Sequence, residues 1–114
     1  MEKEIGFSPS LVGLVKSGQK KITYRLGDKY DFLEVGSVIQ TRNSETNEVF
    51  AKLKITNKFY TTFKDLPIIN SGHESYQSKE EQRKVFEKYY SREIKDAEKV
   101  IVLEFELLEL FSKS

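Results

Sequence analysis

One short stretch of this sequence, Gly18 to Arg25, gathers cations and a hydroxyl group just after an apolar segment. From Ile22 onward apolar and polar residues alternate, which predicts a strand with Thr23 and Arg25 on one face. Lys20 has the wrong parity for that face, so we expect it to act from the turn after Gly18. A threonine hydroxyl is a nucleophile when a base takes its proton, and a lysine is such a base when burial or a neighbouring cation lowers its pKa. The alternative is an exposed strand start with solvated cations.

Acid and base chemistry at this stretch also needs a carboxylate that handles a proton and a water. The acids in loop-like segments are Asp28, Asp31, Asp65 and Glu74. We select Glu74 because it lies in the longest predicted loop, residues 68–76, and long loops in small domains are often functional.

The composition excludes several classes of protein. With one histidine and no cysteine the sequence offers no thiolate nucleophile and no metal site of the usual kind. Phosphate-loop, metalloprotease, nucleophile-elbow and dinucleotide motifs are absent from it, so we expect neither a metal nor an organic cofactor.

Length and charge set the remaining bounds. The 114 residues fit one domain, residues 1–114, and 19 basic against 18 acidic residues give a net charge of +1, so an anion site must be a local cluster. The start of the sequence is charged and no apolar run reaches transmembrane length. We therefore expect a cytoplasmic, monomeric protein with no membrane contact.

Hydrophobic periodicity and turn signals divide the chain into strands and two helices. The predicted strands are residues 2–7, 22–25, 38–42, 48–60 and 100–110, and the predicted helices are 8–17 and 78–90, with one helical turn at 62–67. The apolar run of the last strand indicates an interior position in the sheet. This order predicts an α+β, mainly β fold: a small mixed, mostly antiparallel barrel flanked by two or more helices. An open α+β sandwich is the alternative.

The stretch Gly18-Gln19-Lys20-Lys21-Ile22-Thr23-Tyr24-Arg25 matches the pattern Gly-x-Lys-x-x-(Glu or Thr)-x-Arg. This pattern resembles the signature of the ASCH domain, a PUA-like β-barrel family associated with RNA. The resemblance extends over nearly the whole chain through the Val35-Gly36 turn, residues 62–66, the loop at Glu74 with the helix that follows it, and the last strand.

Within that family, threonine at the sixth motif position is similar to the small bacterial N(4)-acetylcytidine amidohydrolases, which remove an acetyl group from the modified nucleoside. The resemblance implies Lys20 as catalytic lysine, Thr23 as nucleophile and Glu74 as catalytic glutamate, with Arg25 orienting the site. It implies a small-molecule nucleoside as substrate.

The chain departs from the closest enzymes at Ser37, Lys21 and Tyr24, and in the loop of residues 26–34. We expect Ser37 to change only a turn and Tyr24 to face the core. Lys21 could alter the charge at the mouth of the site, and the loop could reshape the substrate pocket.

Two other functions use the same residues. An ASCH module could bind RNA without chemistry, with cations on phosphates and tyrosines stacked on bases, or it could cleave RNA. The residues expected to contact a nucleoside or RNA are Lys21, Arg25, Tyr30, Arg42 and Tyr76.

Overall fold

The computed structural model describes residues 3–111 and contains every element that the sequence predicts within that range. The elements in chain order are β1 (Glu4–Phe7), α1 (Pro9–Lys16), β2 (Ile22–Leu26), β3 (Val38–Asn43), β4 (Val49–Thr62), the short 3-10 helix η1 (Phe63–Asp65), α2 (Lys79–Tyr90) and β5 (Lys99–Leu110). The predicted first strand began at Glu2, which lies outside the described residues.

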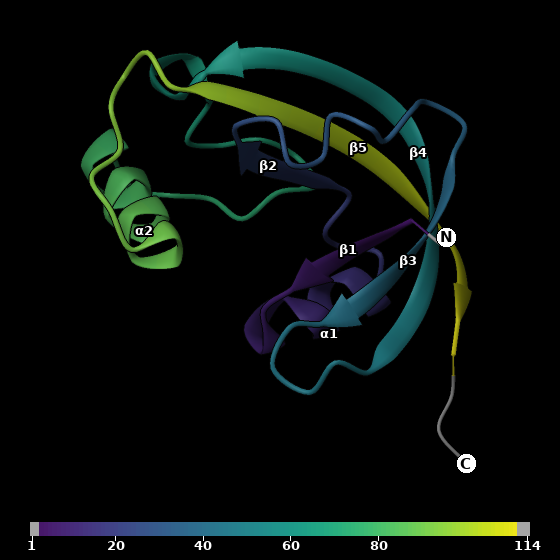
Figure 1. Cartoon of the computed structure of the whole chain (residues 1–114). Coiled ribbons are helices and arrows are strands. Elements are labelled where there is room, and N and C mark those ends of the chain that lie inside the picture. Colours follow the sequence, from purple (N-terminus) through teal and green to yellow (C-terminus); the bar gives the residue numbers. More distant parts are fainter. Residues whose placement is uncertain (1–2, 112–114) are drawn as a thin grey trace.

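The strands form one sheet in the order β1-β3-β4-β5-β2. β1 runs parallel to β3 and the other neighbours are antiparallel. β4 and β5 are long and strongly curved, as Figure 1 shows, and β5 lies inside the sheet as predicted. The predicted mixed, mostly antiparallel α+β fold with flanking helices is confirmed. The sheet is not closed, because β1 and β2 remain its two edges within residues 3–111.

Two hydrophobic clusters lie on opposite faces of β5, whose buried residues alternate between them. The first packs α1 against β1, β3, the first half of β4 and one face of β5, around Phe7, Leu53 and Leu103. The second packs η1 and α2 against β2 and the start of β5, around Phe63 and Phe86. The edge strands β1 and β2 therefore belong to different clusters, and the site described below lies between them.

The ends of the helices follow the signals in the sequence. Gly18 adopts a left-handed φ of 80° just after α1, and the backbone N–H of Lys20 then donates to the Leu14 carbonyl at 3.0 Å. At the start of α2 the Ser78 side chain accepts a hydrogen bond from the Glu81 N–H at 3.1 Å, as a capping residue should. Among residues 3–111, no helix is both long enough and apolar enough to cross a membrane.

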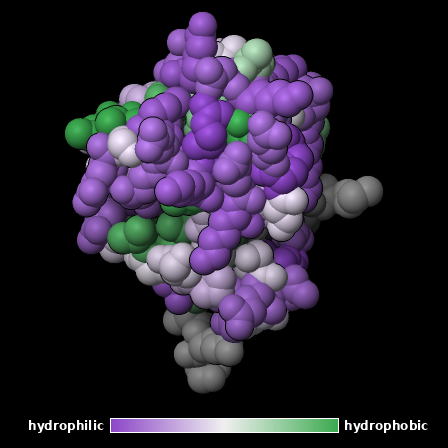
Figure 2. All heavy atoms as spheres, turned by 90° about the vertical axis from the view of Figure 1, so that its left-hand side faces the viewer, coloured by the Kyte–Doolittle hydropathy of each residue, from purple (hydrophilic) through white to green (hydrophobic). Residues whose placement is uncertain are grey.

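Polar residues cover most of the side of the molecule on which α2 lies (Figure 2). Apolar atoms come to the surface there in only a few places. This distribution is consistent with the charged residues, which make up 32% of the sequence.

Candidate active site

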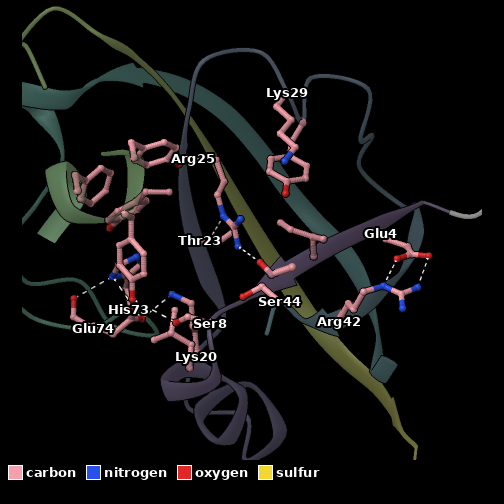
Figure 3. Close-up of a pocket in the computed structure, with 18 of the residues that line it drawn as sticks. Glu4, Ser8, Lys20, Thr23, Arg25, Lys29, Arg42, Ser44, His73 and Glu74 are labelled. Carbon is pink, nitrogen blue, oxygen red and sulfur yellow. Dashed lines mark hydrogen bonds and ion pairs between the residues drawn. The ribbon is translucent and has the colours of Figure 1, made fainter. Parts of the chain in front are cut away.

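A cavity of about 590 Å³ lies between the two edge strands, where the two hydrophobic clusters meet. β1 and the start of α1 form one wall, and β2, the loop of residues 70–76 and α2 form the other. Figure 3 shows Lys20, His73 and Glu74 at one end, Glu4 and Arg42 at the other, and Arg25 between them. The three predicted catalytic residues, Lys20, Thr23 and Glu74, all line this cavity.

Lys20 and Glu74 form an ion pair although 54 residues separate them in the sequence. The Lys20 Nζ donates to Glu74 Oε2 at 2.6 Å, and the side chains are 2% and 27% exposed. The lysine is thus enclosed, whereas the carboxylate is in contact with solvent at the cavity. A charge-assisted hydrogen bond of this length is a suitable path for a proton between the two groups.

The glycine turn after α1 and the loop of residues 70–76 bring this pair together. The Gly72 carbonyl accepts from the backbone N–H groups of Lys21 at 2.7 Å and Ile22 at 3.2 Å, so the loop is attached to the start of β2. Gly72 has a φ of 87°, a conformation that glycine adopts without strain. The attachment places Glu74 opposite Lys20.

Thr23 is buried on β2, and its Oγ1 accepts a hydrogen bond from Arg25 Nε at 2.9 Å. Arg25 also donates from Nη2 to the Gly6 carbonyl on β1 at 2.7 Å, so its guanidinium bridges the two edges of the open sheet. Within residues 3–111, the Thr23 hydroxyl is not hydrogen-bonded to Lys20 in this resting arrangement. The hydroxyl proton of Thr23 remains available for transfer, because Oγ1 acts as acceptor toward Arg25.

The surroundings of the ion pair lower the pKa values of both Lys20 and Glu74. Burial, together with the nearby Arg25 charge, holds the pKa of Lys20 below its ordinary value, against the opposing effect of Glu74. Burial alone would raise the pKa of Glu74, but the charge and hydrogen bond of Lys20 outweigh it and leave that pKa lowered. A lysine with a lowered pKa is better suited to act as a base at neutral pH.

The residues predicted to contact a ligand divide into two groups. Tyr30, Arg42, Tyr76 and Arg25 line the cavity, whereas Lys21 is exposed and lines a smaller depression on the other side of Lys20. The loop at residues 26–34 contributes to the cavity as expected, through Lys29, Tyr30 and Phe32. Ser37 lies in the turn before β3, outside the cavity lining.

Arg42 is paired with a carboxylate at the cavity. Its Nε and Nη2 donate to the two Glu4 carboxylate oxygens at 2.7 and 2.8 Å, and its Nη1 donates to the Asn47 carbonyl. The Glu4 carboxylate therefore balances the charge at this end of the cavity.

Two contributors to the site have roles that the sequence did not reveal. Tyr24 was expected to face the core; it is buried in the second cluster, but its ring also stacks on His73 with a centroid distance of 4.0 Å and an angle of 12°. The sequence alone does not indicate a function for His73. Its position directly before Glu74, as the single histidine of the chain, was the available signal.

No group of three or more acidic or histidine side chains within residues 3–111 is arranged to hold a metal ion. The polar groups of the cavity are instead cations, hydroxyls and single carboxylates. Such groups can bind an organic ligand through hydrogen bonds and can exchange protons with it.

Comparison with solved structures identifies the fold. An ASCH domain from Lactobacillus crispatus superposes with a TM-score of 0.59 at 15% identity, over 83% of this chain and 68% of the other. A protein of Enterococcus faecalis gives a TM-score of 0.71 at 17% identity, over 89% and 68%. A Pyrococcus furiosus protein solved by NMR gives 0.63 at 26% identity, over 96% and 99%.

The sequence itself matches no protein-family model and no curated protein. The fold and the cavity between the sheet edges define a small α+β domain of the PUA-like type. The chain has the fold of the ASCH family, as its motif indicated.

Proposed function

We propose that this protein is an amide hydrolase that removes the acetyl group from N(4)-acetylcytidine or a related acylated nucleoside. The observation that carries the proposal is that a buried lysine, its carboxylate partner and a buried threonine hydroxyl line one cavity. Its volume of about 590 Å³ is within the range of cavities that take small ligands. Aromatic side chains from β2, α2 and two loops offer flat apolar surface to a base.

The first chemical step requires Lys20 as a neutral amine. A proton passes from Lys20 to Glu74 along their 2.6 Å hydrogen bond, which leaves an amine beside a carboxylic acid. The amine then takes the Thr23 proton while Oγ1 attacks the acetyl carbonyl carbon. The Glu74 acid gives its proton to the departing N4 nitrogen, which releases cytidine and leaves acetyl-Thr23.

Hydrolysis of this ester restores the starting state. The Glu74 carboxylate takes a proton from water, and the resulting hydroxide attacks the ester carbonyl. The Thr23 oxygen leaves and receives the proton held by Lys20, and acetic acid is released. The proton on Glu74 then returns to Lys20 along their hydrogen bond, which restores the ion pair. Arg25 Nε lies 2.9 Å from this oxygen and stabilises its negative charge in both steps.

RNA binding without chemistry is the competing function. Its phosphate contacts would depend on cations such as Arg42, whose charge is balanced by Glu4. A binding protein also has no need for a buried lysine with a lowered pKa. These two observations favour the hydrolase.

The test is a chromatographic assay of N(4)-acetylcytidine with the wild type, Lys20→Ala and the matched control Lys54→Ala. Lys54 is an exposed lysine on β4 outside the cavity lining. We expect the wild type and the control to form cytidine at equal rates and Lys20→Ala to form none above background. Failure of the folded wild type to convert any acylated cytidine, together with salt-dependent binding of single-stranded RNA, would replace the hydrolase by the RNA-binding function.

A further inference from the structure

Glu74 occupies a loop rather than a helix or strand, yet its carboxylate must keep its place opposite Lys20. Loops are the more mobile parts of a small protein, and a misplacement of about 1 Å can reduce a reaction rate about a hundredfold. Something in the loop must therefore fix the carboxylate. The backbone attachment through Gly72 ends two residues before Glu74.

The residues between that attachment and Glu74 form a side-chain clamp on β2. The Tyr24 ring stacks on the His73 ring at 4.0 Å, and the Tyr24 hydroxyl accepts from Asn70 Nδ2 at 2.7 Å. The backbone N–H of His73 also donates to the Asn70 carbonyl at 3.0 Å. One tyrosine thus holds two positions of the loop.

His73 is in contact with both polar parts of Glu74. Its Nδ1 lies 2.9 Å from the Glu74 carbonyl oxygen and 3.7 Å from Glu74 Oε2, and its side chain is almost fully enclosed. A neutral imidazole with its proton on Nδ1 donates to that carbonyl and fixes the backbone from which the carboxylate extends. Tyr24 in turn fixes the plane of the imidazole.

We propose that Tyr24 and His73 are positioning residues that hold the Glu74 carboxylate against Lys20. Thr23 and Tyr24 are adjacent on β2, so the clamp ties the carboxylate to the strand that carries the nucleophile. The geometric claim is that the stack of Tyr24 on His73 holds the Glu74 carboxylate in place. The kinetic claim is that this placement raises kcat, and it alone rests on the hydrolase function proposed above. The two claims are measured separately.

The geometric claim is tested on the imidazole of His73, whose NMR signals are assigned without ambiguity because the chain has one histidine. The charges that face this imidazole are those of Lys20, Glu74 and Arg25; burial, Lys20 and Arg25 lower the His73 pKa, and Glu74 raises it. In the wild-type background Glu74→Gln should therefore lower the His73 pKa. In a Tyr24→Ile background, which keeps a strand-forming residue but removes the stack, the same substitution should leave that pKa unchanged.

Tyr24→Phe is the matched control, because it keeps the stacked ring and removes only the hydroxyl. We expect it to preserve the response of His73 to Glu74→Gln. An equal response in the Tyr24→Ile background would show that the stack does not hold His73 at Glu74 and would overturn the proposal.

The kinetic claim is tested with N(4)-acetylcytidine as substrate. Tyr24→Ile should lower kcat about tenfold or more with little change in KM, whereas Tyr24→Phe should remain near the wild-type kcat. His73→Ala, which leaves β2 untouched, should show the same loss of kcat and serves as the second variant if Tyr24→Ile does not fold. A wild-type kcat in His73→Ala refutes the positioning role, and an inactive wild type with the expected NMR responses refutes the hydrolase alone.

Discussion

Replacing Glu74 by glutamine and replacing Lys20 by methionine remove the same ion pair, but we expect unequal losses of stability. In Glu74→Gln the remaining charge is that of Lys20, whose side chain is 2% exposed. In Lys20→Met the remaining charge is that of Glu74, which is 27% exposed and can be hydrated at the cavity. The loss of unfolding free energy on breaking an ion pair is larger when the remaining charge is more deeply buried.

These exposures set the magnitudes. Loss of one partner of a fully buried pair costs about 3–5 kcal/mol, and solvent at the Glu74 side reduces this to about 2 kcal/mol for Glu74→Gln at pH 7. Lys20→Met places an adaptable apolar side chain in an enclosed space and leaves a solvated carboxylate, so its unfolding free energy should stay within about 1 kcal/mol of the wild type.

The pH dependence gives an independent check. The pKa of Lys20 in the folded protein is lowered from 10.5, and without Glu74 it falls further because the carboxylate opposed the shift. Between the folded and unfolded pKa values of such a lysine the unfolded chain binds more protons, so stability rises with pH. The penalty of Glu74→Gln should therefore shrink from pH 7 to about pH 10, close to the unfolded value of about 10.4.

On the acid side stability again rises with pH, because the folded-state pKa of Glu74 is also lowered. The pKa of Glu74 is lowered in the folded protein, so its contribution to stability is present above the ordinary value of 4.5 and is lost as pH falls through the folded value. Glu74→Gln should lack this acid-induced loss.

Urea denaturation at pH 7 and pH 10, followed by circular dichroism, measures the two losses of stability and the change of the Glu74→Gln penalty with pH. The same experiment below pH 4.5 measures the acid-induced loss that Glu74→Gln should lack. A larger destabilisation of Lys20→Met than of Glu74→Gln at pH 7 would show that the exposure of the remaining charge does not set the cost. An equal penalty of Glu74→Gln at both pH values would show that the buried Lys20 charge is not its source.

Two further substitutions, Gly72→Ala and Arg25→Lys, test the positioning of the site, and Gly13→Ala is a control outside it. Gly72→Ala should lower the unfolding free energy by about 1–2 kcal/mol, because its φ is 87° and an added Cβ would lie 3.2 Å from the Lys21 Cβ. Gly13→Ala in α1, where nothing lies within 4 Å, should instead stabilise by about 0.5–1 kcal/mol in the same denaturation experiment. Arg25→Lys keeps the charge but loses the planar fork that reaches Thr23 and β1 together, so kcat should fall although the cation remains; a wild-type kcat in steady-state assays would contradict this.

The elements of the fold were predictable because each has a local signal. Alternation identifies the strands, Ser78 caps α2, and Gly18 ends the turn after α1, as the structure confirms. The open shape of the sheet was not predictable. Periodicity tells which residues share a face, whereas curvature arises from irregularities such as the register shifts of β4 near Leu53 and after Ile55.

The site was predictable in part for the same reason. The place of Lys20 followed from its neighbours, since a glycine turn delivers it to the start of β2. Its ion pair with Glu74 spans 54 positions, and no spacing rule gives such a contact. The stack of Tyr24 on His73 joins a strand to an irregular loop. The backbone path of that loop depends on tertiary hydrogen bonds to the Gly72 carbonyl, which no local sequence pattern predicts.

The central claim is that Thr23 carries the acetyl group during the reaction. Rapid quenching of the wild-type protein with N(4)-acetylcytidine, followed by peptide mass spectrometry, measures this directly. We expect one added acetyl group on the peptide that contains Thr23, and none in Thr23→Val. Steady release of cytidine with Thr23 unmodified at every time point, and an equal rate in Thr23→Val, would contradict the account.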